Sequence, residues 1–324
     1  MILTRRSLAA LTLCAAVLPT GSLAQEYPSR TIQFIVPSTP GTTGDLLARF
    51  LGPRVSQHWG VPVVVENKVG AGGLIGIDAA AKAPPDGYTF LFSATAFSTL
   101  PALRGKLPYD PLKSFLPVVL LGSSPLVLAV TNSVPARTLP EFIAYARKQP
   151  PGKLNYSSPG VGSVHHLTME MLKLQTGLHL THIPYKGAAG ALNDLAAGHV
   201  EASIVVLQTV LPLALSSKIR LLAVTGTQRV AQFPQVPTLA QAGVPNVVSE
   251  AWFGIAAPAG TPAAVLAKLN AEMNSLLALP EVRESMAKAG VDPIGGQPDK
   301  LETLVRSEIR IWTQVVKTAN IAPE

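Results

Sequence analysis

Residues 154–166 read Leu-Asn-Tyr-Ser-Ser-Pro-Gly-Val-Gly-Ser-Val-His-His, and this stretch decides the expected fold. The pattern predicts the end of a strand, a turn rich in glycine and hydroxyl groups, and a helix that begins near Ser163. The first backbone N–H groups of a helix are unpaired and carry the positive end of its dipole, so this turn can hold a carboxylate or a phosphate. Taken alone, the segment is better explained as an ordinary strand-to-helix turn with a serine N-cap.

A second turn of the same kind occurs near the start of the chain. Residues 31–36 form an apolar run typical of a strand, and Gly41, Thr42 and Thr43 precede an amphipathic helix. We expect Asp45 to cap this helix or to bond the loop, because its charge would repel an anionic ligand. Two such turns in one chain favour a ligand site between them.

A third glycine-rich turn resembles a dinucleotide fingerprint only in part. Gly70 and Gly72 fit the first two glycines of G-x-G-x-x-G, but Ile75 occupies the third position. No acidic residue follows at the distance that the ribose contact requires. We therefore expect no nucleotide cofactor, and no other cofactor is indicated.

The first 24 residues have the features of a signal peptide. Arg5 and Arg6 precede an apolar run at residues 8–18, and residues 22–24 read Ser-Leu-Ala. Cleavage near Ala24 would produce a periplasmic protein, and both the general secretory and the twin-arginine routes remain open. Cys14, the only cysteine, lies in this segment, so we expect no disulfide and no thiol chemistry in the mature chain.

The composition excludes some functions. Lys and Arg outnumber Asp and Glu by 26 to 19, but they are scattered in ones and twos, so nucleic-acid binding is not expected. A mild positive field would help to attract anionic solutes, although solvated surface lysines explain the charge equally well. After residue 24 no run of 18 apolar residues is uninterrupted, and about 300 residues suggest two domains.

Motifs along the rest of the chain carry a family resemblance. The first half contains Ile-Val-Pro at 35–37, Pro-Gly at 40–41, Val-Val-Glu-Asn-Lys at 64–68, Pro-Asp-Gly-Tyr-Thr at 85–89 and Leu-Pro-Tyr-Asp-Pro at 107–111. The second half contains Thr-His-Ile-Pro-Tyr-Lys-Gly at 181–187, Val-Pro-Thr at 236–238, Trp-Phe-Gly at 252–254 and Gly-Thr-Pro at 260–262. In this order they resemble successive signatures of the tripartite tricarboxylate transporter substrate-binding proteins, the TctC or Bug (Bordetella uptake gene) family.

The resemblance implies an α/β, two-lobed periplasmic solute-binding protein of the type II-like class. It would have two mostly parallel sheets with flanking helices and crossover strands near residues 126–130 and 252–257. Lobe 1 would comprise residues 25–124 and 252–324, and lobe 2 residues 125–251. Such a protein is expected to be a monomer and not an enzyme. It would capture a small carboxylate and deliver it to the membrane subunits of a tripartite tricarboxylate-type transporter.

The resemblance also assigns site residues in two loops that grip the ligand. The first jaw contains Thr39, Pro40, Gly41, Thr42, Thr43 and Asp45, and the second contains Ser158, Gly160, Gly162, Ser163 and His166. Further wall residues would be Ser93, Thr95, Tyr185 and Lys186. No residue is assigned to catalysis or to a metal.

One departure from the family pattern bears on the ligand. Val205 stands where many members have an aspartate, so the cleft would lack a partner for a ligand amino group. We therefore expect a carboxylate without an amino group. The equally weighted alternative is that Val205 simply faces the core.

Three other functions are alternatives to solute delivery to a transporter. An exported hydrolase would need a nucleophile with a base and an orienting acid, and no G-x-S-x-G elbow is present. A zinc site could be imagined from His165, His166, His179 and His182, but no cysteine or matched carboxylate supports it. A binding protein that reports to a membrane sensor kinase would have the same lobes and pocket, so this alternative stays open.

Overall fold

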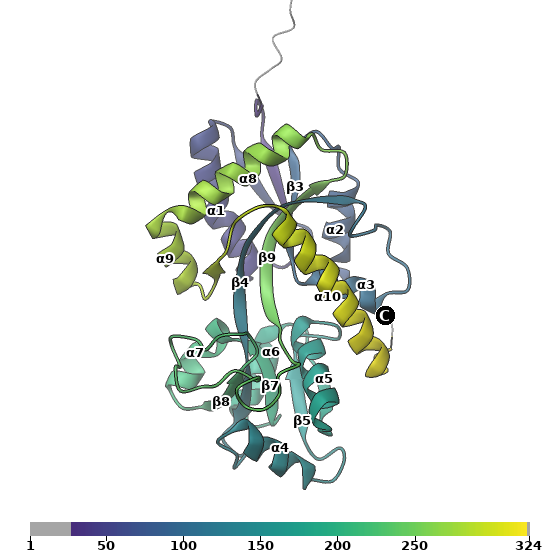
Figure 1. The fold of residues 1–324 in the computed structure, drawn as a ribbon, viewed down its shortest axis with the longest axis vertical. Coiled ribbons are helices and arrows are strands. Elements are labelled where there is room, and N and C mark those ends of the chain that lie inside the picture. Colours follow the sequence, from purple (N-terminus) through teal and green to yellow (C-terminus); the bar gives the residue numbers. More distant parts are fainter. Residues whose placement is uncertain (1–26, 323–324) are drawn as a thin grey trace, which may run out of the picture.

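The structure is a computed structural model that describes residues 27–322. The expected signal peptide at residues 1–24 therefore lies outside the described residues. Two halves are joined along one long axis (Figure 1). We call residues 27–124 and 252–322 lobe 1 and residues 125–251 lobe 2. These bounds are the ones expected from the sequence, limited to the described residues.

Lobe 1 is built on β-α units that follow one another along the chain. Its parallel strands have the order β2-β1-β3. Strand β1 is almost continuously apolar and buried, as expected for a parallel strand that helices cover on both faces. The elements are β1 (Ile32–Val36), α1 (Thr43–Trp59), β2 (Val63–Asn67), η1 (Ala71–Gly73), α2 (Leu74–Ala81), β3 (Thr89–Ala94), α3 (Ala96–Leu103), α8 (Ala263–Ala278), α9 (Pro280–Lys288), β10 (Asp292–Pro293) and α10 (Asp299–Thr318).

Lobe 2 repeats the arrangement with the parallel strands β6-β5-β7. Its elements are α4 (Leu139–Arg147), β5 (Asn155–Ser158), α5 (Val164–Thr176), β6 (Thr181–Pro184), α6 (Ala188–Ala197), β7 (Ala202–Val206), α7 (Leu207–Leu215) and β8 (Ile219–Val224). The expected helix start near Ser163 is confirmed, because Ser163 is the N-cap of α5 and its side chain accepts a bond from the His166 N–H.

Two long antiparallel strands pass from one lobe to the other. Strand β4 (Phe115–Thr131) pairs with β9 (Glu250–Pro258) up to Pro125, and from Leu126 onward it pairs with β7 and β8. The register of β4 with β9 shifts next to Pro117 and again next to Gly122. Irregularities at these points let the strand continue past a proline, which lacks an N–H for the ladder, and past a glycine. Every pair that involves β4 or β9 is antiparallel, whereas the β-α units pair in parallel as expected.

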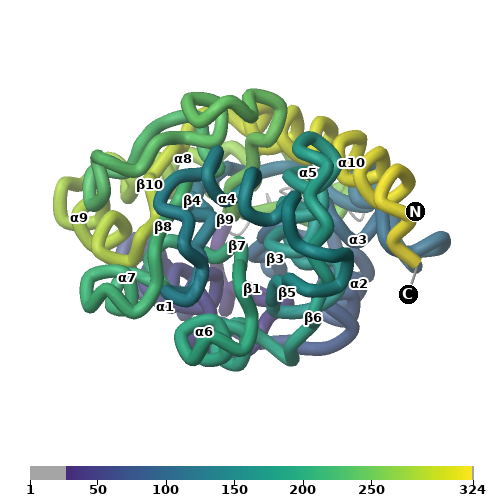
Figure 2. The backbone as a smooth tube through the Cα atoms, turned by 90° about the horizontal axis from the view of Figure 1, so that it is seen from below, coloured from purple at the N-terminus to yellow at the C-terminus, as the bar shows by residue number. Residues whose placement is uncertain are grey.

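The C-terminal helix α10 provides a third connection between the lobes. It packs on α3 of lobe 1 and also contacts α5 of lobe 2, and both views show it along this side of the molecule (Figures 1 and 2). One apolar core cluster includes residues of both lobes, for example Phe92 and Leu128. Between residues 27 and 322 there is no helix with the length and apolar character needed to cross a bilayer.

Candidate functional site: a cleft between the lobes

A cleft of two adjoining chambers lies between the lobes. The first chamber has a volume of about 410 Å³ and the second about 500 Å³. Five residues line both chambers and so mark the junction between them: Thr42, Thr43, Pro159, His165 and Val206. Because Thr42 and Thr43 belong to lobe 1 and the other three to lobe 2, a solute at the junction would touch both lobes.

The N-termini of five helices reach this cleft. Its lining includes the cap or first residue of α1, α3, α5, α6 and α7, namely Thr43, Ala96, Val164, Ala188 and Val206. Each of these helices follows a strand, so the cleft lies at the carboxyl ends of the strands, where α/β sheets bind ligands. No side-chain cap bond is present at the starts of α1, α3, α6 and α7. Their first backbone N–H groups are therefore available to an anion.

The lining of the cleft contains no acidic side chain. Arg104 is the one lysine or arginine among the residues that line the two chambers. Hydroxyl groups come from Thr42, Thr43 and Thr209, while Ala188, Ala189, Ala191 and Val205 make one wall of the first chamber apolar. This combination suits a small anion with an apolar body.

The first jaw is held in place by a buried carboxylate. Asp45 accepts bonds from the Gly41 N–H at 2.9 Å, from Asn67 at 2.9 Å and from Arg49 at 2.9 Å. Burial alone would raise the pKa of Asp45, but these three donors hold it below its ordinary value. Asp45 is 2% exposed and bonds the loop, which is one of the two roles expected from the sequence.

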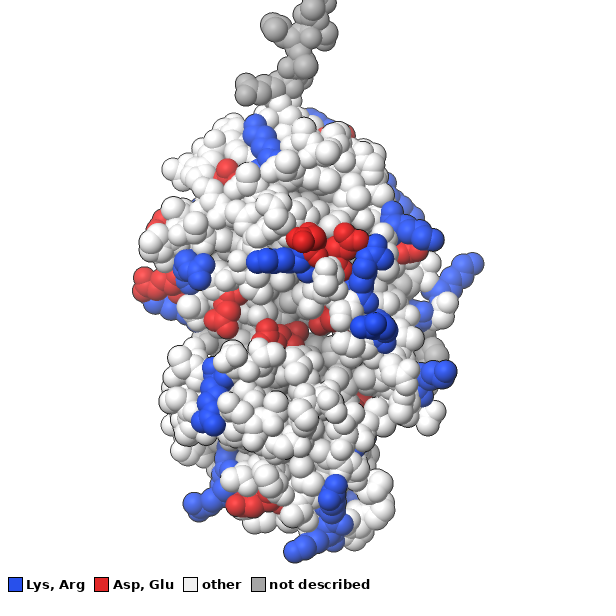
Figure 3. Space-filling view, viewed as in Figure 1, with Lys and Arg blue, Asp and Glu red and all other residues white. Residues whose placement is uncertain are grey.

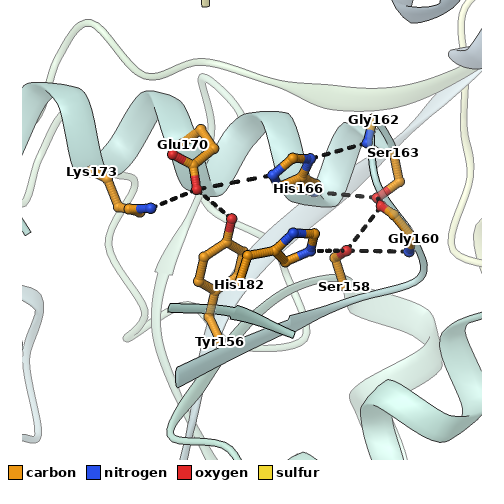
Figure 4. Close-up of polar contacts among 9 residues, drawn as sticks. All are labelled: Tyr156, Ser158, Gly160, Gly162, Ser163, His166, Glu170, Lys173 and His182. Atoms are coloured by element: carbon orange, nitrogen blue, oxygen red, sulfur yellow. Dashed lines mark hydrogen bonds and ion pairs between the residues drawn. The ribbon is translucent and has the colours of Figure 1, made fainter. Parts of the chain in front are cut away.

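The second jaw is fixed by hydroxyl groups within its own turn (Figure 4). Ser163 Oγ donates to the Gly160 carbonyl at 2.8 Å, and Ser158 Oγ lies 3.2 Å from the Gly160 N–H. The Gly162 N–H donates to His166 Nδ1 at 3.0 Å. His166 is therefore a support of the turn, and its acceptor nitrogen places the proton of the neutral ring on Nε2.

Three stacked rings stand behind the second jaw. The His166 and His182 rings lie 3.9 Å apart and nearly parallel, and Tyr156 stacks on His182 at 4.9 Å. The Tyr156 hydroxyl and Lys173 both donate to Glu170 (Figure 4). Burial, with the positive charges of His182 and Lys173, lowers the pKa of His166 to about 3. Burial also lowers the pKa of His182 to about 4, although the Glu170 carboxylate opposes it.

The structure brings together part of the expected site. The expected residues that line the cleft are Pro40, Gly41, Thr42, Thr43, Thr95, Gly160, Gly162 and Ser163. The others line neither chamber: Thr39, Asp45, Ser93, Ser158, His166, Tyr185 and Lys186. Several of these bond to the protein instead, as Ser93 does to the Gly254 carbonyl and Tyr185 does to Asp194. As ligand contacts, both groups remain predictions.

Several lining residues were not found from the sequence. They are His165, Arg104, Thr99, Thr209, Val206 and Phe253. His165 adjoins the expected turn, so its place in the first turn of α5 was a usable signal. Arg104 and Phe253 lie far from both jaws in the chain; no local pattern marks Arg104, and the Trp-Phe-Gly motif at 252–254 does not by itself place Phe253 in the cleft. Val205 is 4% exposed yet lines the first chamber, so it faces both the core and the cleft wall.

The histidines do not converge as metal ligands. Within residues 27–322, no group of three or more His, Cys, Asp or Glu side chains could hold a metal ion. His166 and His182 instead stack face to face, so the nitrogens in the two ring planes do not point at a shared position between the rings.

Solved structures of known proteins resemble the whole described chain. The protein of R. palustris called Rpa4515, solved with adipate, is 37% identical, with a TM-score of 0.82 over 92% of this chain and 100% of that one. The periplasmic binding protein BugD is 33% identical, with a TM-score of 0.79 over 92% of this chain and 100% of that one. MatC of Rhodopseudomonas palustris, solved with malate, is 32% identical, with a TM-score of 0.78 over 90% of this chain and 100% of that one.

A family comparison gives the same result. The model for the tripartite tricarboxylate transporter family receptor, TctC, matches residues 47–321. These residues contain the second jaw and both long connecting strands. The α/β periplasmic-binding-protein fold is thereby confirmed. The chain belongs to the TctC family, also known through its Bug members, which are solute-binding receptors and not enzymes.

Proposed function

We propose that this receptor captures a small carboxylate in the interlobe cleft and delivers it to the membrane subunits of a tripartite tricarboxylate-type transporter. It would work in the periplasm as a monomer, after removal of the segment up to Ala24. The observation that carries the proposal is the convergence of five helix N-termini on a cleft whose lining has no acidic side chain.

The chemistry of the lining favours a carboxylate over a cation or a neutral sugar. Uncapped N–H groups at the starts of α1 and α3 offer donors from lobe 1, and the first N–H groups of α5 that its Ser163 cap does not bond offer them from lobe 2. Charge-assisted bonds of this kind contribute roughly 1.5–3 kcal/mol each. A few of them are enough for micromolar binding after the costs of association.

The amount and distribution of charge agree with a small-molecule ligand. On the face drawn in Figure 3, lysines and arginines stand in ones and twos over both lobes rather than in one patch. That pattern gives no track for a nucleic-acid backbone. The cleft also offers no carboxylate to pair with an ammonium group, so we propose a ligand without an amino group. Adipate and malate, which two relatives hold, have this character.

Closure of the lobes on the ligand would produce a closed conformation that the membrane subunits of the transporter could distinguish from the empty protein. Each jaw belongs to a different lobe, so a carboxylate bound between them stabilises the closed arrangement over the open one. The strands β4 and β9 provide the hinge region, because both run through the boundary between the lobes.

The proposal is tested by thermal unfolding of the protein with mono-, di- and tricarboxylates, amino acids and neutral sugars. A ligand that binds only the folded state raises the melting temperature by mass action. We expect at least one carboxylate without an amino group to raise it, with no change for sugars. A shift only with amino acids or sugars would contradict the proposal.

A further inference from the structure

We propose that His165 determines specificity by hydrogen bonding a hydroxyl group of the ligand, so that hydroxycarboxylates bind in preference to the same carboxylates without the hydroxyl. The inference rests on the proposed function, because it assumes a carboxylate in this cleft. It assigns to His165 a role that the family signatures at Ser163 and His166 do not give it.

The position of His165 is the first step. The residue is the second of helix α5, and its ring lines both chambers at their junction. A ligand held by the starts of α1 and α5 and extending into either chamber must therefore pass this ring. The lining of the first chamber also includes Ala188, Ala189 and Ala191, so His165 is one of the few polar side chains that a ligand with an apolar body would meet there.

The second step is that the ring is unpaired. Its Nδ1 is enclosed and has no hydrogen-bond partner among the described residues, and Nε2 likewise makes no bond to them. The neighbouring histidines differ, since His166 Nδ1 accepts from the Gly162 N–H and His182 Nε2 bonds Ser158 Oγ at 2.7 Å. Because Nδ1 is enclosed, a ligand in the cleft meets the ring at Nε2, which makes no bond to the described residues and so can pair with a ligand hydroxyl.

The third step is the charge state. Burial lowers the pKa of His165 to about 4. At neutral pH the ring is then uncharged, with one N–H donor and one acceptor. A hydroxyl group can both donate and accept, so it can bond either tautomer. A methylene at the same place leaves the ring unpaired, and such sites discriminate strongly against the analogue without the hydroxyl.

The experiment is calorimetric titration with matched pairs of ligands: malate with succinate, lactate with propionate, and 3-hydroxyadipate with adipate. The proteins are the wild type, His165→Leu and, as a control, His179→Leu, which changes an exposed histidine away from the cleft. We expect the wild type and the control to prefer the hydroxylated member of at least one pair by about tenfold. In His165→Leu the preference should fall below about twofold, while the affinity for the unhydroxylated member changes by less than about threefold.

The outcomes separate the inference from the proposed function. If the wild type binds carboxylates without preference for the hydroxyl, or if His165→Leu weakens both members equally, the inference is wrong and the proposed function stands. If no carboxylate binds the wild type, both are overturned. Ring nitrogen shifts of His165 in labelled protein provide a second readout, which should move with the hydroxylated ligand and stay unchanged with its partner.

Discussion

Asp45 is a buried side chain that holds the first jaw in shape through its bonds to the protein. Its carboxylate gathers the Gly41 N–H, the Asn67 amide and the Arg49 guanidinium, and these bonds fix the loop before α1. Asp45 is therefore a positioning residue of the first jaw.

Replacing Asp45 with alanine should destabilise the protein by about 1–3 kcal/mol, because buried donors lose their acceptor. It should also weaken carboxylate binding about tenfold or more through disorder of the first jaw. Urea unfolding and calorimetry measure the two effects. Asp86→Ala is the matched control, since Asp86 forms an exposed ion pair with Arg30 whose loss should cost less than about 1 kcal/mol. Equal effects of the two changes would refute the positioning role.

The stacked histidines predict a dependence of stability on pH. The folded-state pKa values of His166 (about 3) and His182 (about 4) lie below the ordinary value of 6.5, so the unfolded chain binds more protons between these limits. Their stabilising contribution is complete above about pH 6.5 and is lost as the pH falls through that range. Protonation of His166 at Nδ1 also removes the acceptor of the Gly162 N–H.

The measurement is the free energy of unfolding in urea at several pH values between 7 and 4. For His166→Phe, which keeps a ring in the stack, the loss of stability on acidification should be shallower than in the wild type. The difference should be at most about 1.4 kcal/mol per pH unit, the limit for one proton. His199→Phe, at an exposed histidine, should follow the wild type. Identical slopes for all three proteins would contradict the prediction.

At the scale of elements, the turn before α5 meets helix α3 across the cleft. Gly162 has φ +70°, and a Cβ built there would lie 2.0 Å from Leu103 Cδ1. Gly162 belongs to lobe 2 and Leu103 to lobe 1, so a side chain at residue 162 would press against the other lobe. A side chain at residue 162 would therefore act as a wedge between the lobes.

Gly162→Ala should lower the carboxylate affinity by about tenfold or more, because the closed arrangement must displace Leu103. Gly177→Ala is a close control: Gly177 has φ +67° with nothing within 4 Å, so it carries the same backbone strain without the clash. Calorimetry should show little change in affinity for Gly177→Ala, and Leu103→Ala combined with Gly162→Ala should recover part of the loss. Equal loss of affinity in both glycine variants would indicate strain rather than a wedge.

The elements also show what the sequence could and could not reveal. Strand-to-helix turns such as residues 158–163 depend on local chemistry, so Ser163 could be identified as an N-cap from the sequence. The family resemblance predicts a crossover strand only near residues 126–130, whereas β4 runs from Phe115 to Thr131. It is longer because β9 pairs with it and register shifts accommodate Pro117 and Gly122, which depends on a partner more than 100 residues away. Arg104 and Phe253 join the site for the same long-range reason.

At the scale of the molecule, three connections decide how the lobes can move. Strands β4 and β9 run through the boundary, and α10 reaches from lobe 1 to α5, the helix that carries the second jaw (Figures 1 and 2). A jaw fixed to α5 is thereby coupled to the position of lobe 1. We expect a bound carboxylate to accept hydrogen bonds from both lobes at once.

A crystal structure of the protein with the carboxylate that most raises its melting temperature tests this claim most directly. We predict a ligand carboxylate at the junction of the two chambers, bonded by backbone N–H groups at the starts of α1 and α5. A ligand bound outside this cleft, for example in the cavity beside Arg137 and Arg220 in lobe 2, would contradict it.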